Sequence, residues 1–195
     1  CQVICEVDER KINGFCENPK NRCYICKKAI FQQIQKTAAE FHLASIVEGS
    51  NIDDLGDYRP GMRAIAELGV KSPLQEAGLT KAEIRALSAE LGLDTWDKPS
   101  YACLASRFVY GETITREKLA MVDQAEQLLL DLGFRQMRVR LHGTMARIEV
   151  LPEQFDFLMQ EEVRTKIVEQ FTAYGFTYVS LDLKGFRSGS MNEIL

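Results

Sequence analysis

Three cysteines stand in surroundings that favour thiolate chemistry. Cys23 and Cys26 form a CxxC where a polar loop is expected to give way to a helix, and a helix N-terminus stabilises negative charge. Cys103 lies in a loop with Ser106 and Arg107, and a neighbouring cation favours the thiolate over the thiol. These residue types predict metal binding, redox chemistry or nucleophilic attack by sulfur.

The CxxC by itself leaves the choice between these chemistries open. A structural zinc site needs more ligands than one CxxC supplies, and His42 and His142 fall in an expected helix and an expected strand without ligand spacing. An isolated CxxC is more often a redox pair, or two small buried residues, than half of a metal site. Cys103 is equally compatible with a small apolar side chain packed in a loop.

Arginines alternate along the expected strand 136–142. Because side chains alternate between the two faces of a strand, Arg138 and Arg140 share the face opposite the apolar residues. Like charges in a row repel each other unless something negative neutralises them. We predict either an anion or phosphate site, or a solvated sheet face balanced by Glu149 and Asp182.

Glu126 is a carboxylate within the apolar arc of the expected helix 115–132. Carboxylates rarely enter such an arc without a partner. Either Glu126 lies at the edge of the arc and reaches solvent, or it pairs with an arginine such as Arg138 or Arg140 at a site.

A polar loop follows the expected short strand 43–49. It begins at Gly49 and carries Asn51, Asp54 and Arg59. In open α/β sheets, ligands bind at the carboxyl ends of the strands. The loop is either a nucleotide or metal contact or a solvated connection.

Periodicity and turn signals predict the elements that position these residues. The first half alternates helix and strand as an α/β layer does, with helix 27–42, strand 43–49 and helix 80–92. The last of these opens with a capping box of Thr80 and Glu83. The second half predicts an α+β module with a three-stranded sheet, in the order helix 115–132, strand 136–142, strand 146–150, helix 153–173 and strand 177–183.

The composition is that of a globular protein and excludes several classes of function. The 195 residues are 46% hydrophobic and 27% charged, with a formal charge of −4, so overall charge gives no reason to bind nucleic acid. No apolar run is long enough to span a membrane, and the charged first residues do not form a signal peptide. We expect a soluble, cytoplasmic protein without a membrane or nucleic-acid partner. Because the chain begins with Cys1 rather than Met, we also expect a fragment of a longer protein.

Several separate motifs occur together and in order: Asn18–Lys27, Glu48–Asp54, Asp57–Gly61, Ala102–Arg107, Arg138–Arg140 and Leu181–Asn192. Jointly they resemble the LarE family of PP-loop ATP pyrophosphatases, which are ATP-dependent sulfur transferases that help to build the nickel-pincer nucleotide cofactor. The resemblance implies a Rossmann-like PP-loop domain in residues 1–98 and a small α+β substrate and sulfur-transfer domain in residues 99–195. The family's Ser-Gly-Gly-x-Asp-Ser loop is absent and is expected before Cys1, so the first domain is expected to be truncated here.

The resemblance also implies a reaction. ATP with Mg²⁺ activates a carboxylate of pyridinium-3,5-biscarboxylic acid mononucleotide as an acyl adenylate, and sulfur then displaces AMP to give a thiocarboxylate. Cys23, Cys26 and Cys103 match a family pattern that holds a [4Fe-4S] cluster with one iron left open for an extra sulfide, and thiolates suit iron–sulfur chemistry. The alternative is a sacrificial route, in which Cys103 gives up its own sulfur and becomes dehydroalanine.

The same resemblance assigns the remaining candidates. The substrate phosphate is expected to bind Ser106, Arg107, Arg138 and Arg140. The nucleotide is expected to contact Gly49, Asn51, Asp54 and Arg59. Glu126 is the candidate catalytic residue that orients these arginines or transfers a proton. The family further implies a homo-oligomer.

Two competing functions stay open. One is a tRNA thiolase of the same superfamily, which the acidic charge balance disfavours. The other is a non-catalytic module in which Cys23 and Cys26 bind structural zinc and the second half mediates assembly.

Overall fold

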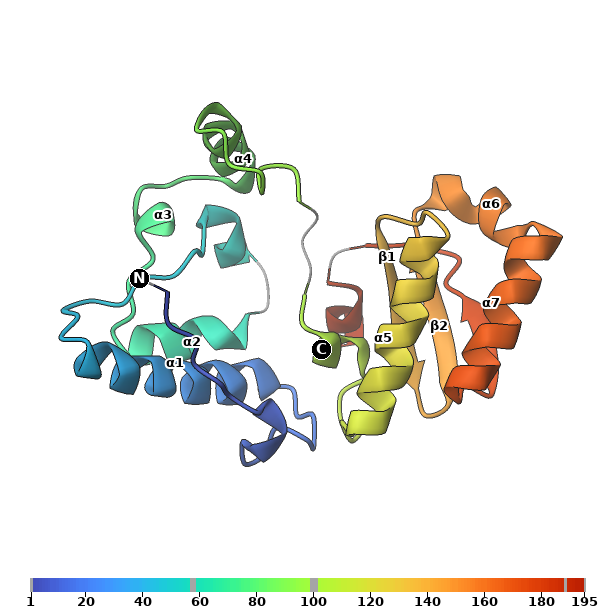
Figure 1. Ribbon diagram of the computed structural model, residues 1–195, viewed down its shortest axis with the longest axis horizontal. Helices are drawn as coiled ribbons and strands as arrows, with labels where there is room; N and C mark the ends of the chain where they lie inside the picture. Colours follow the sequence, from blue (N-terminus) through green and yellow to red (C-terminus); the bar gives the residue numbers. More distant parts are fainter. Residues whose placement is uncertain (1, 57–58, 99–101, 188, 195) are drawn as a thin grey trace. The chain divides into compact units, whose positions relative to one another are not determined.

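A computed structural model describes residues 2–56, 59–98, 102–187 and 189–194 of the protein (Figure 1). The chain divides into two compact units. Unit 1 consists of Cys1–Phe15 and Pro19–Lys98, and unit 2 of Cys16–Asn18 and Pro99–Leu195. Both helices and strands are present, which confirms the predicted mixed α/β class.

Unit 1 is built from helices. They are η1 (Glu9–Lys11), α1 (Arg22–Glu40), η2 (Ile52–Gly56), α2 (Pro60–Glu67), α3 (Pro73–Glu76) and α4 (Lys81–Glu90). Helices α1 and α2 pack against each other (Figure 1). The predicted helix 27–42 exists, but α1 begins earlier, at Arg22, so the CxxC lies inside its first turns. The predicted capping box is confirmed, since Thr80 and Glu83 each accept a backbone N–H of the other at the start of α4.

The predicted strand 43–49 is wrong. The segment forms only one isolated parallel bridge, between Val47 and Lys71. The Lys71 N–H donates to the Ile46 carbonyl at 3.0 Å, and the Glu48 N–H to the Lys71 carbonyl at 2.9 Å. Pairing stops there because the chain after Lys71 enters α3, whose first residue is a proline.

Unit 2 contains a three-stranded sheet of β1 (Met137–His142), β2 (Met145–Val150) and β3 (Tyr178–Leu181) in the order β1-β2-β3. Strands β1 and β2 pair antiparallel, and β2 and β3 pair parallel. The helices are η3 (Leu104–Arg107), α5 (Arg116–Asp131), η4 (Pro152–Gln154), α6 (Phe155–Met159), α7 (Glu161–Tyr174) and η5 (Ser190–Ile194). Helix α5 packs on β1 and on α7 (Figure 1). The predicted hairpin and three-stranded sheet are confirmed.

One predicted element of unit 2 is divided. The expected helix 153–173 is interrupted at Gln160, whose extended backbone (φ −56°, ψ 138°) ends α6 and starts α7. The core of the unit lies between α5, α7 and the apolar face of β1, where Val122, Leu129, Val139, Leu141 and Phe171 are fully buried. The described part of the chain contains no helix long and apolar enough to cross a membrane.

Residues 16–18 belong to unit 2 although they precede α1. Asn18 is fully buried in a left-handed conformation (φ 51°) that asparagine tolerates better than most residues. Its Nδ2 donates to the Val109 carbonyl at 2.6 Å, and its own carbonyl accepts the Gly111 N–H at 2.9 Å. These bonds tie the segment to the chain that follows η3.

Candidate functional site

Arg107 anchors the turn that carries Cys103. Its side chain is 2% exposed, and its Nε and Nη2 donate to the two oxygens of Glu126 on α5 at 2.9 and 2.7 Å. Such a bidentate pair fixes the plane of the guanidinium. The remaining nitrogen, Nη1, donates to the carbonyls of Ala102 (2.8 Å) and Cys103 (3.1 Å) and to Ser106 Oγ (3.0 Å). The backbone around Cys103 is therefore held, while the Cys103 residue itself is exposed.

Glu126 is buried and fully engaged. Of the two predicted situations, the pairing with an arginine is the one observed, but the partner is Arg107 rather than Arg138 or Arg140. The Val139 N–H donates to Glu126 Oε1 at 2.9 Å, so α5 is also bonded to the backbone of β1. Sequence spacing could not show this partner, because Arg107 lies 19 residues before Glu126 in a separate element, η3.

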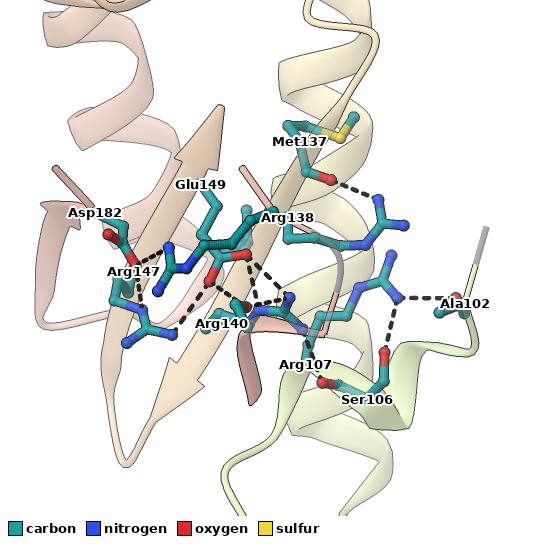
Figure 2. A network of polar contacts seen from close by, with 12 residues as sticks. Ala102, Ser106, Arg107, Met137, Arg138, Arg140, Arg147, Glu149 and Asp182 are labelled. Atoms are coloured by element: carbon teal, nitrogen blue, oxygen red, sulfur yellow. Dashed lines mark hydrogen bonds and ion pairs between the residues drawn. The ribbon is translucent and has the colours of Figure 1, made fainter. Parts of the chain in front are cut away.

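Arg140 links the same turn to the sheet. Its Nη1 donates to the Ser106 carbonyl at 2.9 Å, and its Nε and Nη2 donate to Glu149 Oε2 at 3.1 and 2.9 Å (Figure 2). Glu149 is fully buried and also accepts Ser190 Oγ at 2.8 Å and Arg147 Nη2 at 3.2 Å. The ion pair thus joins η3, two strands and the C-terminal turn η5.

Arg138 adds a third guanidinium beside Arg107 and Arg140 (Figure 2). It is 8% exposed, donates from Nη1 to the Met137 carbonyl at 2.6 Å and lies 5.2 Å from the ring centre of Phe186. Burial, together with the charges of Arg107 and Arg140, lowers the pKa of Arg138 below its usual value. An anion placed beside these groups would relieve that repulsion.

Of the predicted solvated face balanced by Glu149 and Asp182, the balancing charges are observed but the solvation is not. Arg138 and Arg140 are buried, so they do not form a solvated face. Glu149 does balance the charge as predicted, and Asp182 pairs with Arg147 and Arg187. The structure therefore brings Ser106, Arg107, Arg138 and Arg140 together next to the backbone of Cys103. Glu126 joins this group through its ion pair with Arg107.

The CxxC lies in the first turns of α1 in unit 1, not in the loop before the helix as predicted. Cys23 is exposed and Cys26 half-buried. The Nη2 of Arg22 lies 3.8 Å from Cys23 Sγ. Cys103 belongs to unit 2. The described residues contain no gathered group of three or more His, Cys, Asp or Glu that is able to hold a metal ion.

The predicted nucleotide residues form a compact turn after Glu48. The Asn51 N–H donates to Asp54 Oδ2 at 3.0 Å, and Asp54 Oδ1 pairs with Arg59 Nη1 at 2.6 Å. Gly49 has open space where a side chain would project. Asp57 and Tyr58, which belong to one of the recognised motifs, lie outside the described residues.

Comparison with known proteins identifies relatives over almost the whole chain. No protein-family model matches. The chain is 44% identical to an uncharacterized protein of Synechocystis sp., covering 98% of this chain and 72% of that protein. It is 43% identical to the pyridinium-3,5-bisthiocarboxylic acid mononucleotide synthase of Lactiplantibacillus plantarum, covering 91% of this chain and 64% of the synthase. An uncharacterized protein of Methanocaldococcus jannaschii is 31% identical, with 91% and 69% covered.

The chain belongs to the LarE family. It spans less than two thirds of the synthase from Lactiplantibacillus plantarum.

Proposed function

We propose that the protein is an ATP-dependent sulfur transferase acting on pyridinium-3,5-biscarboxylic acid mononucleotide. A substrate carboxylate attacks the α-phosphate of ATP, forming an acyl adenylate and releasing pyrophosphate; sulfide then attacks the acyl carbon, AMP leaves, and a thiocarboxylate remains. Membership of the LarE family supports this reaction. The observation that carries it is the cluster of buried arginines beside the exposed Cys103 in unit 2.

The arginine cluster is the proposed site of the substrate phosphate. Arg138 and Arg140 supply charge and donors from β1, and Ser106 supplies a hydroxyl from the adjoining turn. Arginine suits this task because its planar fork matches phosphate oxygens. Arg107 contributes charge and holds the turn. Glu126 orients Arg107, since its two oxygens already accept three N–H groups.

The polar turn of unit 1 is the proposed contact for ATP and its Mg²⁺. Gly49 leaves room for a ligand, while Asn51, Asp54 and Arg59 supply polar groups. We accordingly propose residues 1–98 as part of a Rossmann-like PP-loop domain and residues 99–195 as the substrate and sulfur-transfer domain. We also propose a homo-oligomer, which light scattering of the purified protein tests.

The sulfur source is proposed to be a [4Fe-4S] cluster held by Cys23, Cys26 and Cys103. The donor chemistry fits, because all three residues are cysteines and iron–sulfur clusters are bound by cysteine thiolates. When bound by three thiolates, the cluster would supply sulfide from the iron that has no protein ligand. The first turns of α1 carry Cys23 and Cys26, and Arg107 donates to the carbonyl of Cys103 and so holds the backbone from which that side chain projects.

A second sulfur source follows from the exposure of Cys103. Its thiolate attacks the acyl adenylate, AMP leaves and a thioester forms. Loss of the Cα proton of Cys103 then breaks its Cβ–S bond, leaving the thiocarboxylate and dehydroalanine. This route consumes the protein after one turnover, and the held backbone with an exposed side chain at Cys103 is the observation that favours it.

Iron and sulfide analysis after anaerobic purification distinguishes the two routes. The cluster route predicts about four irons per chain, lost in Cys23→Ala and retained in the control Cys5→Ala, whose thiol donates to the Thr37 hydroxyl. The sacrificial route predicts no iron and a loss of mass corresponding to H₂S at Cys103 after turnover. Absence of both results contradicts the proposed sulfur chemistry.

A further inference from the structure

Glu48 in unit 1 is a largely buried carboxylate that none of the sequence motifs marked as a site residue. Its side chain is 12% exposed. Oε1 accepts the Ser72 hydroxyl at 2.5 Å and the Ser50 N–H at 3.0 Å, and Oε2 accepts the Ser50 hydroxyl at 2.8 Å. Ser50 and Ser72 are each 7% exposed. The carboxylate thus accepts hydrogen bonds from two segments of the chain, one at Ser50 and one at Ser72.

The segments joined by Glu48 have little else to hold them in register. Segment 46–48 meets Lys71 through two backbone hydrogen bonds only. Ser72 follows Lys71 directly, and its bond to Glu48 extends this short contact by one side-chain link. Glu48 therefore fixes the point from which the Gly49–Asp54 turn leaves.

Lys27 brings the start of α1 into the same arrangement. Its ammonium lies 4.0 Å from Glu48 Oε2. Its stem crosses Gly61 in the first turn of α2, where an added Cβ would stand 2.8 Å from Lys27 Cδ and 3.4 Å from the Cys23 carbonyl. Only glycine permits so close an approach. Lys27 therefore contacts both ends of the loop that runs from Glu48 to Gly61.

The Gly49–Asp54 turn is held by bonds within its loop and by bonds to the chain around α3 and α4. The bonds of Asp54 to Asn51 and Arg59 are internal to the loop. The Ile52 N–H donates to the Leu79 carbonyl at 3.0 Å, Gln75 Nε2 to the Asn51 carbonyl at 3.5 Å, and the Lys81 N–H to Asp53 at 2.8 Å. Gln75 and Leu79 are half-buried and α4 buries no residue, whereas Glu48 attaches the start of the turn to the buried Ser72.

We infer that Glu48 is a positioning residue for nucleotide binding, which holds the Gly49–Asp54 turn against Ser72 and the start of α1. The inference rests on the proposed function, because this turn is the proposed contact for ATP. It goes beyond that proposal by assigning a role to a carboxylate outside the proposed nucleotide contacts. The same attachment ties the nucleotide turn to the helix that carries Cys23 and Cys26.

Hydrogen exchange of the ATP-free protein tests the attachment directly. In Glu48→Gln, amides of peptides covering residues 49–56 should exchange about tenfold faster, as expected when a charge-assisted hydrogen bond is replaced by a neutral one. Glu67→Gln is the matched control: Glu67 also accepts from several side chains, Tyr24, Lys28 and Arg63, but on the surface of α2. Glu67→Gln should leave the amide exchange rates of residues 49–56 unchanged.

Titration with ATP tests the consequence for binding. Glu48→Gln should weaken ATP affinity about tenfold and leave affinity for the pyridinium mononucleotide unchanged. Ser72→Ala, which keeps the carboxylate and removes one donor, should move both exchange and ATP affinity in the same direction by a smaller amount. Circular dichroism checks that each variant is folded.

The outcomes separate the inference from the proposed function. Unchanged exchange at residues 49–56 in both Glu48→Gln and Ser72→Ala overturns the positioning role, whatever ATP does. Faster exchange with unchanged ATP affinity also overturns it. If the unmodified protein does not bind ATP, the proposed function fails, and the exchange measurement alone then decides whether Glu48 holds the turn.

Discussion

Glu126 shows how one buried carboxylate organises a reactive turn. It compensates the charge of Arg107, which in turn bonds to the backbone of Cys103. Removing one partner of a buried pair costs more than the pair contributes, because the other charge stays buried without compensation.

We expect Glu126→Gln to lower the free energy of unfolding by about 3 kcal/mol. Denaturant unfolding followed by circular dichroism measures this. Asp123→Asn, on the exposed face of the same helix, is the control and should change stability by less than about 0.5 kcal/mol. Equal effects of the two substitutions would contradict the role given to the buried pair.

Arg138 carries the prediction for substrate binding. Because it belongs to the arginine cluster of unit 2, Arg138→Ala should weaken binding of the pyridinium mononucleotide tenfold or more, as loss of a charged hydrogen bond does. ATP affinity should hardly change. Calorimetric titration with each ligand measures both, with Arg164→Ala on the exposed face of α7 as control. Equal losses of affinity for both ligands would contradict the assignment of Arg138 to the site of the substrate phosphate.

Glu48 also gives the protein a specific acid sensitivity. Burial acts to raise its pKa, but hydrogen bonds from Ser72 and Ser50 and the charge of Lys27 outweigh this, so its pKa lies below 4.5. The resulting stability is present above the unfolded value of 4.5 and is lost as pH falls through the lower folded value. The difference in unfolding free energy between the unmodified protein and Glu48→Gln should therefore shrink on acidification. If this difference in unfolding free energy grew on acidification, the lowered pKa of Glu48 in the folded protein would be contradicted.

At the scale of elements, two helices begin with a threonine cap, and the two caps should differ in how much of the fold they stabilise. Thr80 caps α4, which buries no residue, whereas Thr115 caps α5, whose face forms the core of unit 2. Each cap is worth about 1 kcal/mol.

We expect Thr115→Ala to lower the melting temperature of unit 2. Thr80→Ala should mainly speed amide exchange in the first turn of α4 and leave unit 2 unaffected. Calorimetry and hydrogen exchange on the same samples distinguish the two. A loss of unit 1 stability in Thr80→Ala as large as the loss of unit 2 stability in Thr115→Ala would show that α4 is more firmly packed than its exposure indicates.

The elements that sequence predicted well are those with strong local signals. Helix α5, the β1–β2 hairpin and the capping box of α4 follow from periodicity, a glycine turn and paired caps. Segment 43–49 has the composition of a strand, but whether it forms one depends on a neighbour with which to pair, and Pro73 ends that pairing. The interruption at Gln160 has no comparable signal in its residue type.

The candidate site shows the same division between local and distant causes. Strand alternation places Arg138 and Arg140 on the same face of β1. The pairing of β1 with β2 in the predicted hairpin brings them close to Glu149. The partners Arg107 for Glu126 and Ser72 for Glu48 lie at separations that no local pattern encodes. These pairs are set by tertiary contacts between elements distant in sequence.

At the scale of the whole molecule, Asn18 connects the two separate stretches of sequence that make up unit 2. Asn18→Ala removes the bond to Val109 and places alanine at a positive φ. We expect the free energy of unfolding to fall by about 2 kcal/mol and the amide hydrogens of residues 108–114 to exchange faster. Asn18→Gly, which keeps the backbone conformation, should recover part of the loss. No recovery would show that the side-chain bonds alone matter.

The return of residues 16–18 to unit 2 has a consequence for how the chain is made. During synthesis these residues emerge about ninety positions before the segment 108–114 to which they bond, so unit 2 closes a contact of long sequence separation. Neither unit is a contiguous stretch of sequence. A graft or shuffling event with a single crossover after position 98 would therefore carry unit 2 away without Asn18, and recombination of this protein needs three crossovers, after positions 15, 18 and 98, to move a complete unit.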